Sequence, residues 1–348
     1  MKVGLVGLPG SGKTTIFSAL TGLTVETGPG GRVKTNLGVV KVPDPRIDRL
    51  VALCKPKKIT PTELAIADVA GEGKPHQGYF DASRTAAMRE MDVLAQIVHG
   101  FPDAAGAPPD PAAEIRTFAT EVNLQDLMLV ERRIERLKKE KGPPREGAAL
   151  EKIKAALEAD RPVRLAGLPP DELLLFQGFR FLSEKPLLVV LNVDESGAGR
   201  ETPAAVIEAA RAFDAPVVVL SGKIEQEIAE LPDAERVEFL KSLGLTEPAA
   251  HRFIRAAFDA ARLHCFFTVG EDEVRAWAIP RGATAVRAAG KIHSDLERGF
   301  IRGEVIAYED FDALGSEARA RDAGKLRAEG RDYVMRDGDI MHVRFTPA

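Results

Sequence analysis

The sequence has few cysteines and few aromatic residues, and it has no long hydrophobic run. Its 348 residues include two cysteines, Cys54 and Cys265, too few for the disulfide framework of a small secreted domain. The longest apolar stretches, 186–193 and 215–220, fall far short of the ~20 residues that a membrane-spanning helix needs. The first residues, Met1–Gly7, show no apolar segment of the kind that signal peptides carry. We therefore expect a cytoplasmic protein with reduced thiols and no membrane partner.

An excess of positive charge is also missing. The 52 acidic and 48 basic residues leave a formal net charge of −4. This balance excludes electrostatic binding of nucleic acid over the whole surface but not at a local basic face. Hydrophobic residues make up 45% of the chain and charged residues 29%, as in ordinary globular proteins. The length predicts two or three domains.

Short apolar segments with strand character alternate with helical segments over much of the chain. Several are apolar at every position, as in parallel strands that helices cover on both faces. This alternation predicts an α/β fold with a doubly wound sheet. The expected strands are 2–6, 37–42, 62–69, 93–98, 187–192 and 217–220.

A long charged helix is expected between the fourth and fifth of these strands, at 112–140. Apolar residues recur there at spacings of three and four, which predicts a narrow helical seam. The Gly-Pro-Pro within 141–147 ends this helix, and a second helical period follows. We interpret the two segments as an inserted antiparallel hairpin; the alternative is two ordinary surface helices. The seam residues are Leu127, Val130, Ile134, Leu137, Leu150, Ile153 and Leu157.

The last 80 or so residues predict a small α+β module, near the lower end of domain sizes. A helix is expected at 285–298. We expect His293 to cap or pack within this module rather than to bind a metal, because no His or Cys cluster with ligand spacing accompanies it. The expected strands are 273–279, 300–307, 332–335 and 340–345.

The strongest motif lies between the first strand and the first helix. It reads Gly7-Leu8-Pro9-Gly10-Ser11-Gly12-Lys13-Thr14 and matches the phosphate-binding loop G-x-x-x-x-G-K-[ST]. Backbone amides and the helix N-terminus would surround phosphate oxygens. Lys13 would neutralise the β- and γ-phosphates, and Thr14 would bind Mg²⁺. The nucleotide-binding residues predicted here are Gly7, Pro9, Gly10, Ser11, Gly12, Lys13, Thr14 and Thr15.

A second motif, Asp68-Val69-Ala70-Gly71, closes the strand at 62–69. Asp-x-x-Gly at this place is typical of switch nucleotidases, in which the carboxylate holds Mg²⁺ through water and the glycine amide meets the γ-phosphate. We therefore predict Asp68 as a metal residue and Gly71 as a nucleotide contact.

Two loops at later strand ends resemble base-binding loops. Asn192-Val193-Asp194-Glu195 stands where guanine-specific proteins carry Asn-Lys-x-Asp. Val193 and Glu195 replace the lysine and the aspartate, which argues against strong guanine selectivity. Ser221-Gly222-Lys223 resembles the Ser-Ala-Lys loop of the same proteins. The two loops leave ATP and GTP open. The predicted contacts are Asn192, Val193, Glu195, Ser221, Gly222 and Lys223.

Together these segments resemble the YchF family of Obg-related P-loop NTPases. The similarity runs in one order through nearly the whole chain. The matching words are VGLP at 6–9, NLGVV at 36–40, PDPR at 43–46, DVAG at 68–71, NVDE at 192–195, IAEL at 228–231, EVRAW at 273–277, GATA at 282–285, IHSD at 292–295, RGFIR at 298–302 and EVIAYEDF at 304–311.

The resemblance implies a G domain, a coiled-coil insertion and a β-grasp (TGS) domain. It also implies binding and slow hydrolysis of ATP in addition to, or in preference to, GTP, and association with ribosomes. Arginines and lysines of the TGS domain and the hairpin are the candidate RNA contacts, and we expect a monomer. The expected boundaries are 1–111 and 166–267 for the two parts of the G domain, 112–165 for the hairpin and 268–348 for the TGS domain.

Several positions depart from the family pattern and raise the alternative of a diverged paralogue. The phosphate loop reads Gly-Ser-Gly-Lys-Thr instead of Asn-Val-Gly-Lys-Ser. The first switch is short, so Thr35 is the nearest candidate for its Mg²⁺ ligand. Glu72 follows Gly71, where Ras-like enzymes carry a glutamine that orients water. We hypothesise that His76 or Gln77 takes that role alongside Lys13; the alternative is two exposed loop residues.

Three functions remain at this stage. The first is a nucleotide-hydrolysing switch acting on ribosomes. The second is a nucleotide-binding adaptor with negligible hydrolysis, and the third is a small-molecule kinase, against which no arginine-rich lid is found. No arginine that assists hydrolysis is assigned, because we expect Arg84 and Arg89 to be solvated on a helix surface.

Overall fold

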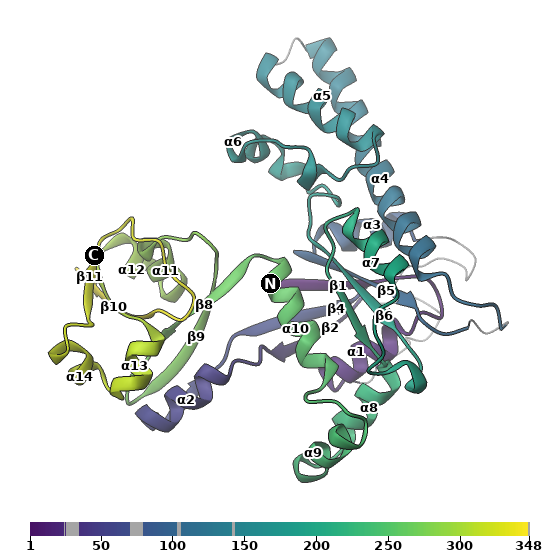
Figure 1. Cartoon of the computed structure of the whole chain (residues 1–348). Coiled ribbons are helices and arrows are strands. Elements are labelled where there is room, and N and C mark those ends of the chain that lie inside the picture. Colours follow the sequence, from purple (N-terminus) through teal and green to yellow (C-terminus); the bar gives the residue numbers. More distant parts are fainter. Residues whose placement is uncertain (24, 26–34, 70–78, 103–105, 141–142, 347–348) are drawn as a thin grey trace. The chain divides into compact units, whose positions relative to one another are not determined.

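Two six-stranded sheets organise the chain in this computed structural model (Figure 1). The structure describes every residue except 24, 26–34, 70–78, 103–105, 141–142 and 347–348. The first sheet belongs to a unit formed by residues 1–40 and 65–260, and the second to a unit formed by residues 41–64 and 261–348. In the described part of the chain, no helix has both the length and the apolar character that crossing a bilayer requires.

The first sheet has the order β2-β4-β1-β5-β6-β7. Strand β1 pairs in parallel with β4 and β5, and β6 pairs in parallel with β5 and β7. Every residue of β5 and β6 is buried, which explains why their sequences are apolar apart from Gln96, His99 and Asn192. The predicted doubly wound fold is confirmed. Its strands are β1 (Lys2–Val6), β2 (Asn36–Lys41), β4 (Glu63–Asp68), β5 (Val93–His99), β6 (Leu187–Asn192) and β7 (Val217–Leu220).

Helices cover this sheet. Two of them, α1 and α8, begin at the predicted phosphate loop and at the loop after β7. Helix α1 packs against α8, and α10 packs against β6 and β7. On another side, α3, α4 and α7 share one hydrophobic cluster with β5 and β6. The helices are α1 (Lys13–Thr21), α3 (Ala82–Arg89), α4 (Pro111–Glu140), α5 (Pro144–Glu158), α6 (Pro170–Leu173), α7 (Ala204–Arg211), α8 (Gly222–Glu230), α9 (Asp233–Ser242) and α10 (Ala249–Ala260), with single turns η1 (Val163–Leu165), η2 (Leu174–Phe179) and η3 (Glu195–Gly197).

Helix α4 belongs to two cores. Ile115 and Phe118 are fully buried against the sheet, whereas Val130, Ile134 and Leu137 pack against α5 in a separate cluster. The predicted antiparallel hairpin is therefore present, and its seam is the one read from the sequence. Because 30 residues form one continuous helix, the hairpin is a direct extension of an element of the first unit.

The hairpin is more than two helices. Val163, Phe176 and Phe181 are each 1% exposed and belong to the same cluster. At its base, the buried Asp126 of α4 accepts hydrogen bonds from the backbone of Leu182 (3.0 Å) and Ser183 (2.7 Å). The expected boundary after residue 165 is thus too early, because the chain up to about residue 181 completes the hairpin core.

The second sheet has the order β11-β10-β12-β8-β9-β3. Strands β8 and β9 are antiparallel, β12 lies parallel to β8, and β10 is antiparallel to β12. With α11 between β9 and β10, this is the predicted β-grasp arrangement. The elements are α2 (Pro45–Cys54), β3 (Lys58–Thr60), β8 (Leu263–Thr268), β9 (Glu273–Pro280), α11 (Ala285–Ile292), α12 (Ser294–Arg298), β10 (Phe300–Ile306), α13 (Tyr308–Leu314), α14 (Glu317–Asp322), β11 (Arg327–Glu329) and β12 (Ile340–Phe345).

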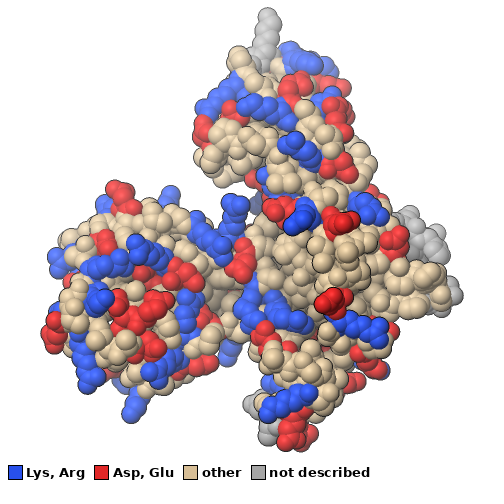
Figure 2. Space-filling view, in the orientation of Figure 1, with Lys and Arg blue, Asp and Glu red and all other residues tan. Residues whose placement is uncertain are grey.

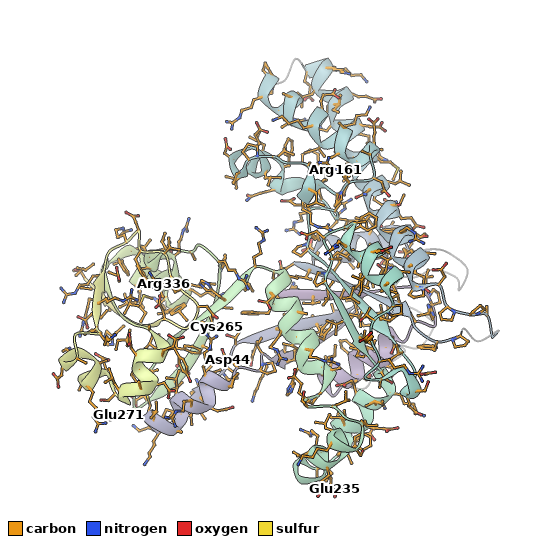
Figure 3. All side chains as sticks on the ribbon, in the orientation of Figure 1. Asp44, Arg161, Glu235, Cys265, Glu271 and Arg336 are labelled. Atoms are coloured by element: carbon orange, nitrogen blue, oxygen red, sulfur yellow. The ribbon has the colours of Figure 1, made fainter. Side chains whose placement is uncertain are left out.

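Residues 41–64 are part of this second unit, although we assigned them to the G domain. Strand β3 extends the sheet by pairing in parallel with β9, and α2 packs against β9 and α13. Arg46 bonds to Asp44 and Asp337 and lies over the ring of Phe267. Asp44 and Cys265 are labelled in Figure 3 on neighbouring elements of this unit. The C-terminal segment of this unit begins at residue 261 rather than 268, because β8 lies in the middle of its sheet.

Two further expectations for this unit are corrected. The helix expected at 285–298 breaks at His293, whose backbone is extended and whose Nδ1 accepts the Asp295 amide at 3.2 Å; the predicted capping role is confirmed. Residues 332–335 form no strand, since only Val334 makes a single bridge, to Thr284. The neighbouring edge is taken instead by β11, which pairs with β10.

Candidate functional site

The phosphate loop, residues 7–14, joins β1 to α1 and depends on its glycines. Gly10 and Gly12 have φ angles of +84° and +87°, a left-handed conformation that disfavours residues with a side chain. A Cβ on Gly12 would lie 2.2 Å from Asn192 Nδ2, and one on Gly7 would lie 2.4 Å from the Ile97 carbonyl oxygen. The glycine spacing of the motif is therefore required by both backbone conformation and space.

Lys13 lies inside this loop. Its Nζ donates hydrogen bonds to the carbonyl oxygens of Gly7 (2.8 Å) and Leu8 (2.9 Å). Burial lowers the pKa of Lys13 to about 8, and the carboxylates of Asp68 and Glu114 oppose this shift. The phosphates of a nucleotide would add negative charge here and favour the ammonium form. The loop thus holds a partly desolvated cation ready for an anion.

Thr14 and Asp68 bring two oxygen ligands together at the end of the loop. Thr14 Oγ1 donates to Asp68 Oδ2 at 3.3 Å, because β4 pairs with β1 and places Asp68 opposite Leu5. Burial raises the pKa of Asp68, opposed by Lys13 and Thr14. A hydroxyl and a carboxylate fit Mg²⁺, which takes its other ligands from water and phosphate. Thr35 is exposed, directly before β2. Gly71, Glu72, His76 and Gln77 lie outside the described residues.

Asn192 was predicted to contact the base; in the structure its side chain bonds to two neighbouring loops. Its side chain is 4% exposed, and Nδ2 donates to the Ser11 carbonyl oxygen at 2.8 Å. Its Oδ1 accepts the Gly222 amide at 3.0 Å. Asn192 therefore ties the phosphate loop to the loop after β7. Ser11 is fully buried, and its amide donates to the Leu8 carbonyl oxygen at 3.3 Å.

Replacing Asn192 with Ala removes both of these bonds. We expect nucleotide affinity to fall about tenfold and the free energy of unfolding to fall by about 1–3 kcal/mol, because the Ser11 carbonyl and the Gly222 amide lose their buried partner. Calorimetric titration and thermal unfolding measure the two effects. Gln226→Ala, an exposed change on α8, is the control. Equal behaviour of the two variants would contradict the role of Asn192.

The loops after β6 and β7 meet through charged side chains. Glu195 forms an ion pair with Lys223, and both side chains are more than half exposed. By contrast, the Val193 side chain is buried in the core, and its contact with the base stays a prediction. The Ser221 hydroxyl is buried and makes no hydrogen bond among the described residues. Of the predicted base contacts, Glu195 and Lys223 have accessible side chains at this edge, and the backbone of Gly222 is held by Asn192.

His99 was missed in the sequence, although it ends β5 at the same edge of the sheet. A Cβ on Gly10 would lie 3.6 Å from His99 Nε2, and Nδ1 lies 2.9 Å from Glu114 Oε1. A polar residue ending a fully buried strand beside β1 was the available signal. Arg84 was also misjudged: its side chain is 12% exposed, its Nη1 donates to the Tyr79 carbonyl at 2.9 Å, and its charge helps to lower the pKa of Lys13.

Known proteins match this chain over its whole length. It is 42% identical to the "Ribosome-binding ATPase YchF" of Pasteurella multocida and 38% identical to the protein of that name from Bacillus subtilis, with 99% of each chain covered. A solved structure, the Schizosaccharomyces pombe YchF GTPase, is 28% identical, with a TM-score of 0.87 over 99% of this chain and 97% of that one.

The second unit carries a match of its own. Residues 263–346 match the family model YchF-GTPase_C, described as "Protein of unknown function (DUF933)". This range starts with β8 and ends one residue after β12, so it covers the strands β8 to β12 and omits residues 41–64. At 38–42% identity over 99% of its length, and with the phosphate loop and the Thr14–Asp68 pair in place, the chain belongs to the YchF family of P-loop nucleotide-binding proteins.

Proposed function

We propose that this chain binds ATP or GTP with Mg²⁺, hydrolyses it to the nucleoside diphosphate and phosphate, and acts as a switch at the ribosome in the cytoplasm. The observation that carries the proposal is the Lys13 ammonium inside a glycine-defined loop, next to the Thr14–Asp68 pair. The printed names of the relatives, "Ribosome-binding ATPase YchF" and "YchF GTPase", support the same assignment.

Catalysis by these residues is positioning and charge stabilisation. The loop amides and Lys13 hold the triphosphate and neutralise charge that develops on its oxygens. Thr14 and Asp68 would hold Mg²⁺, with Thr35 as the candidate from the first switch. When bound, Mg²⁺ neutralises the β- and γ-phosphate oxygens. His76 or Gln77 is our candidate for orienting the attacking water. Glu72 is not, because its negative charge is unfavourable next to the γ-phosphate.

Ribosome contact would involve local surfaces rather than a continuous basic face. On the face shown in Figure 2, basic and acidic residues alternate over both units. Many arginines of the TGS-like module and the hairpin are already ion-paired, among them Arg287, Arg298, Arg302, Arg133 and Arg136. Any RNA contact by these side chains competes with a protein carboxylate. Ribosome association should still weaken as salt rises if phosphate groups are contacted.

Product analysis separates this function from its alternatives. Nucleotide-stripped protein is incubated with ATP or GTP and Mg²⁺, with and without ribosomes. Free phosphate is the expected product, released faster in the presence of ribosomes. Nucleotide binding without phosphate release would favour an adaptor with negligible hydrolysis. A phosphorylated small molecule would favour a kinase and contradict the proposal.

Calorimetric titration with ATPγS and GTPγS addresses the choice of base. Tenfold tighter ATPγS binding, about 1.4 kcal/mol, would show that Glu195 has lost the guanine contact. Tenfold tighter GTPγS binding would show that the Ser221–Lys223 loop dominates. The pairing of Glu195 with Lys223 removes a free carboxylate from the guanine-reading position, so we expect the first result.

A further inference from the structure

Two neighbouring strand ends support the phosphate loop. Strands β5 and β6 are paired so that His99 stands opposite Asn192. Asn192 bonds to the Ser11 carbonyl, and the His99 ring points its Nε2 toward Gly10, 3.6 Å from where a Cβ would stand. At both places the loop residue facing the side chain is a glycine with positive φ. His99 therefore fills the space beside Gly10 as Asn192 fills the space beside Gly12.

Glu114 fixes the His99 ring. Its Oε1 lies 2.9 Å from His99 Nδ1, and its Oε2 accepts the His99 backbone amide at 3.4 Å. The two side chains are only 10% and 14% exposed, and the ring of Phe101 meets His99 edge-on at 5.8 Å. A carboxylate that grips both the ring and the backbone leaves the imidazole little freedom to turn away from the loop.

The same residue of α4 also bonds to Tyr79, the first described residue after position 69. The Glu114 carbonyl oxygen accepts a hydrogen bond from the Tyr79 hydroxyl at 3.3 Å and another from Gln96 Nε2 at 2.9 Å. Tyr79 is 2% exposed and its ring meets Phe118 of α4 at 5.0 Å. One turn of α4 thus contacts both the support of the phosphate loop and the residue that follows segment 70–78.

Helix α4 continues from this turn into the hairpin. At 1.5 Å per residue, Leu137 in the hairpin core lies about 35 Å from Glu114 along one helix. The hairpin core and the sheet core are separate clusters, and between them α4 packs against β5 and α7 and accepts the Leu182 and Ser183 amides at Asp126. The helix is therefore a continuous path between the two cores.

We propose that His99 and Glu114 are positioning residues that couple the phosphate loop to helix α4. Filling the loop with a triphosphate changes the stability of α4 and of the hairpin, and a contact on the hairpin changes the affinity for the triphosphate by the same factor. This inference rests on the proposed nucleotide-binding function and deepens it, because it names how the site and the hairpin communicate.

Hydrogen–deuterium exchange of the full chain tests the coupling. Peptides covering 111–122 and 127–157 are followed with and without saturating ATPγS or GTPγS and Mg²⁺. In the wild type we expect the nucleotide to change exchange rates in both peptides at least fivefold. In His99→Ala and Glu114→Ala we expect nucleotide binding about five- to tenfold weaker and, at saturation, no response in α4.

Matched variants separate coupling from general damage. Glu114→Gln keeps an acceptor for His99 and should keep most of the α4 response, and His99→Gln is the milder second change should either alanine variant fail to fold. Arg116→Ala, an exposed change on the same helix, should behave as wild type. A wild-type response in the His99 and Glu114 variants would overturn the coupling, as would nucleotide binding by the wild type without any change in α4. Failure of the wild type to bind either nucleotide would instead overturn the proposed function.

Discussion

Replacing Gly12 with Ala should reduce nucleotide affinity at least 100-fold. The new Cβ would stand 2.2 Å from Asn192 Nδ2, at a φ of +87°, so the loop must move or Asn192 must leave. The left-handed conformation alone costs about 1–2 kcal/mol for a residue with a side chain. Moving Asn192 also breaks its bonds to Ser11 and Gly222. Calorimetric titration with ATPγS and GTPγS measures the loss.

The control for this prediction is Gly22→Ala. Gly22 ends the same helix, α1, with a φ of +69°, and no atom lies within 4 Å of its Cβ position. This variant bears the conformational cost without the collision, so its stability should fall slightly while its nucleotide affinity stays near that of the wild type. Comparable affinity of the two variants would show that the contact between Asn192 and the loop does not define the site.

Removing residues 41–64 from the second unit should unfold it. A fragment of 261–348 alone would lose the edge strand β3 and helix α2, together with the bonds from Arg46 to Asp337 and from Thr60 to Glu273. The buried Ile47 and Leu50 are each worth about 1.5–3 kcal/mol, a large share of the 5–15 kcal/mol that stabilises a domain. We expect the isolated fragment to lack a cooperative unfolding transition and a fusion of 41–64 with 261–348 to regain it.

A point variant makes the same test in the full chain. Leu50 is fully buried, so Leu50→Ala should destabilise the second unit by about 2–5 kcal/mol. Asp48→Ala, exposed on the same helix, should change stability by less than about 1 kcal/mol. Thermal unfolding with intrinsic fluorescence of Trp277, which belongs to this unit, follows the effect. A cooperative, stable 261–348 fragment would contradict both expectations.

Local patterns predicted most of the fold and the centre of the site. The phosphate loop is encoded within residues 7–14, and Asp68 is placed by the strand that it ends. The hairpin seam was also readable, because Val130, Ile134 and Leu137 repeat along one helix face.

Features that depend on distant partners were not predictable in the same way. The residues near Lys58 and Arg46 in the sequence do not predict pairing with β9 or with Asp337. Asp272 likewise lies 215 residues from its partner Lys57. His99 and Glu114 are 15 residues apart and meet only because α4 packs beside β5. Arg84 and Arg89 look like solvated helix residues until their carbonyl partners at Tyr79, Phe179 and Arg180 are known. The bond from Asn192 to Ser11, 181 residues away, is likewise visible only in the tertiary structure.

The second unit is built from two segments that are far apart in the sequence, 41–64 and 261–348. The first segment is therefore synthesised long before the second. Arg46 leaves the ribosome 291 residues before its partner Asp337, which at about 5–20 residues per second corresponds to about 15 to 60 s. Until β9 has been synthesised, the apolar face of α2 has no sheet to cover it. The nascent chain must therefore hold this face in another transient contact or expose it to chaperones. The β-grasp strands are translated after α2, so Leu50 can be buried only once they have been made.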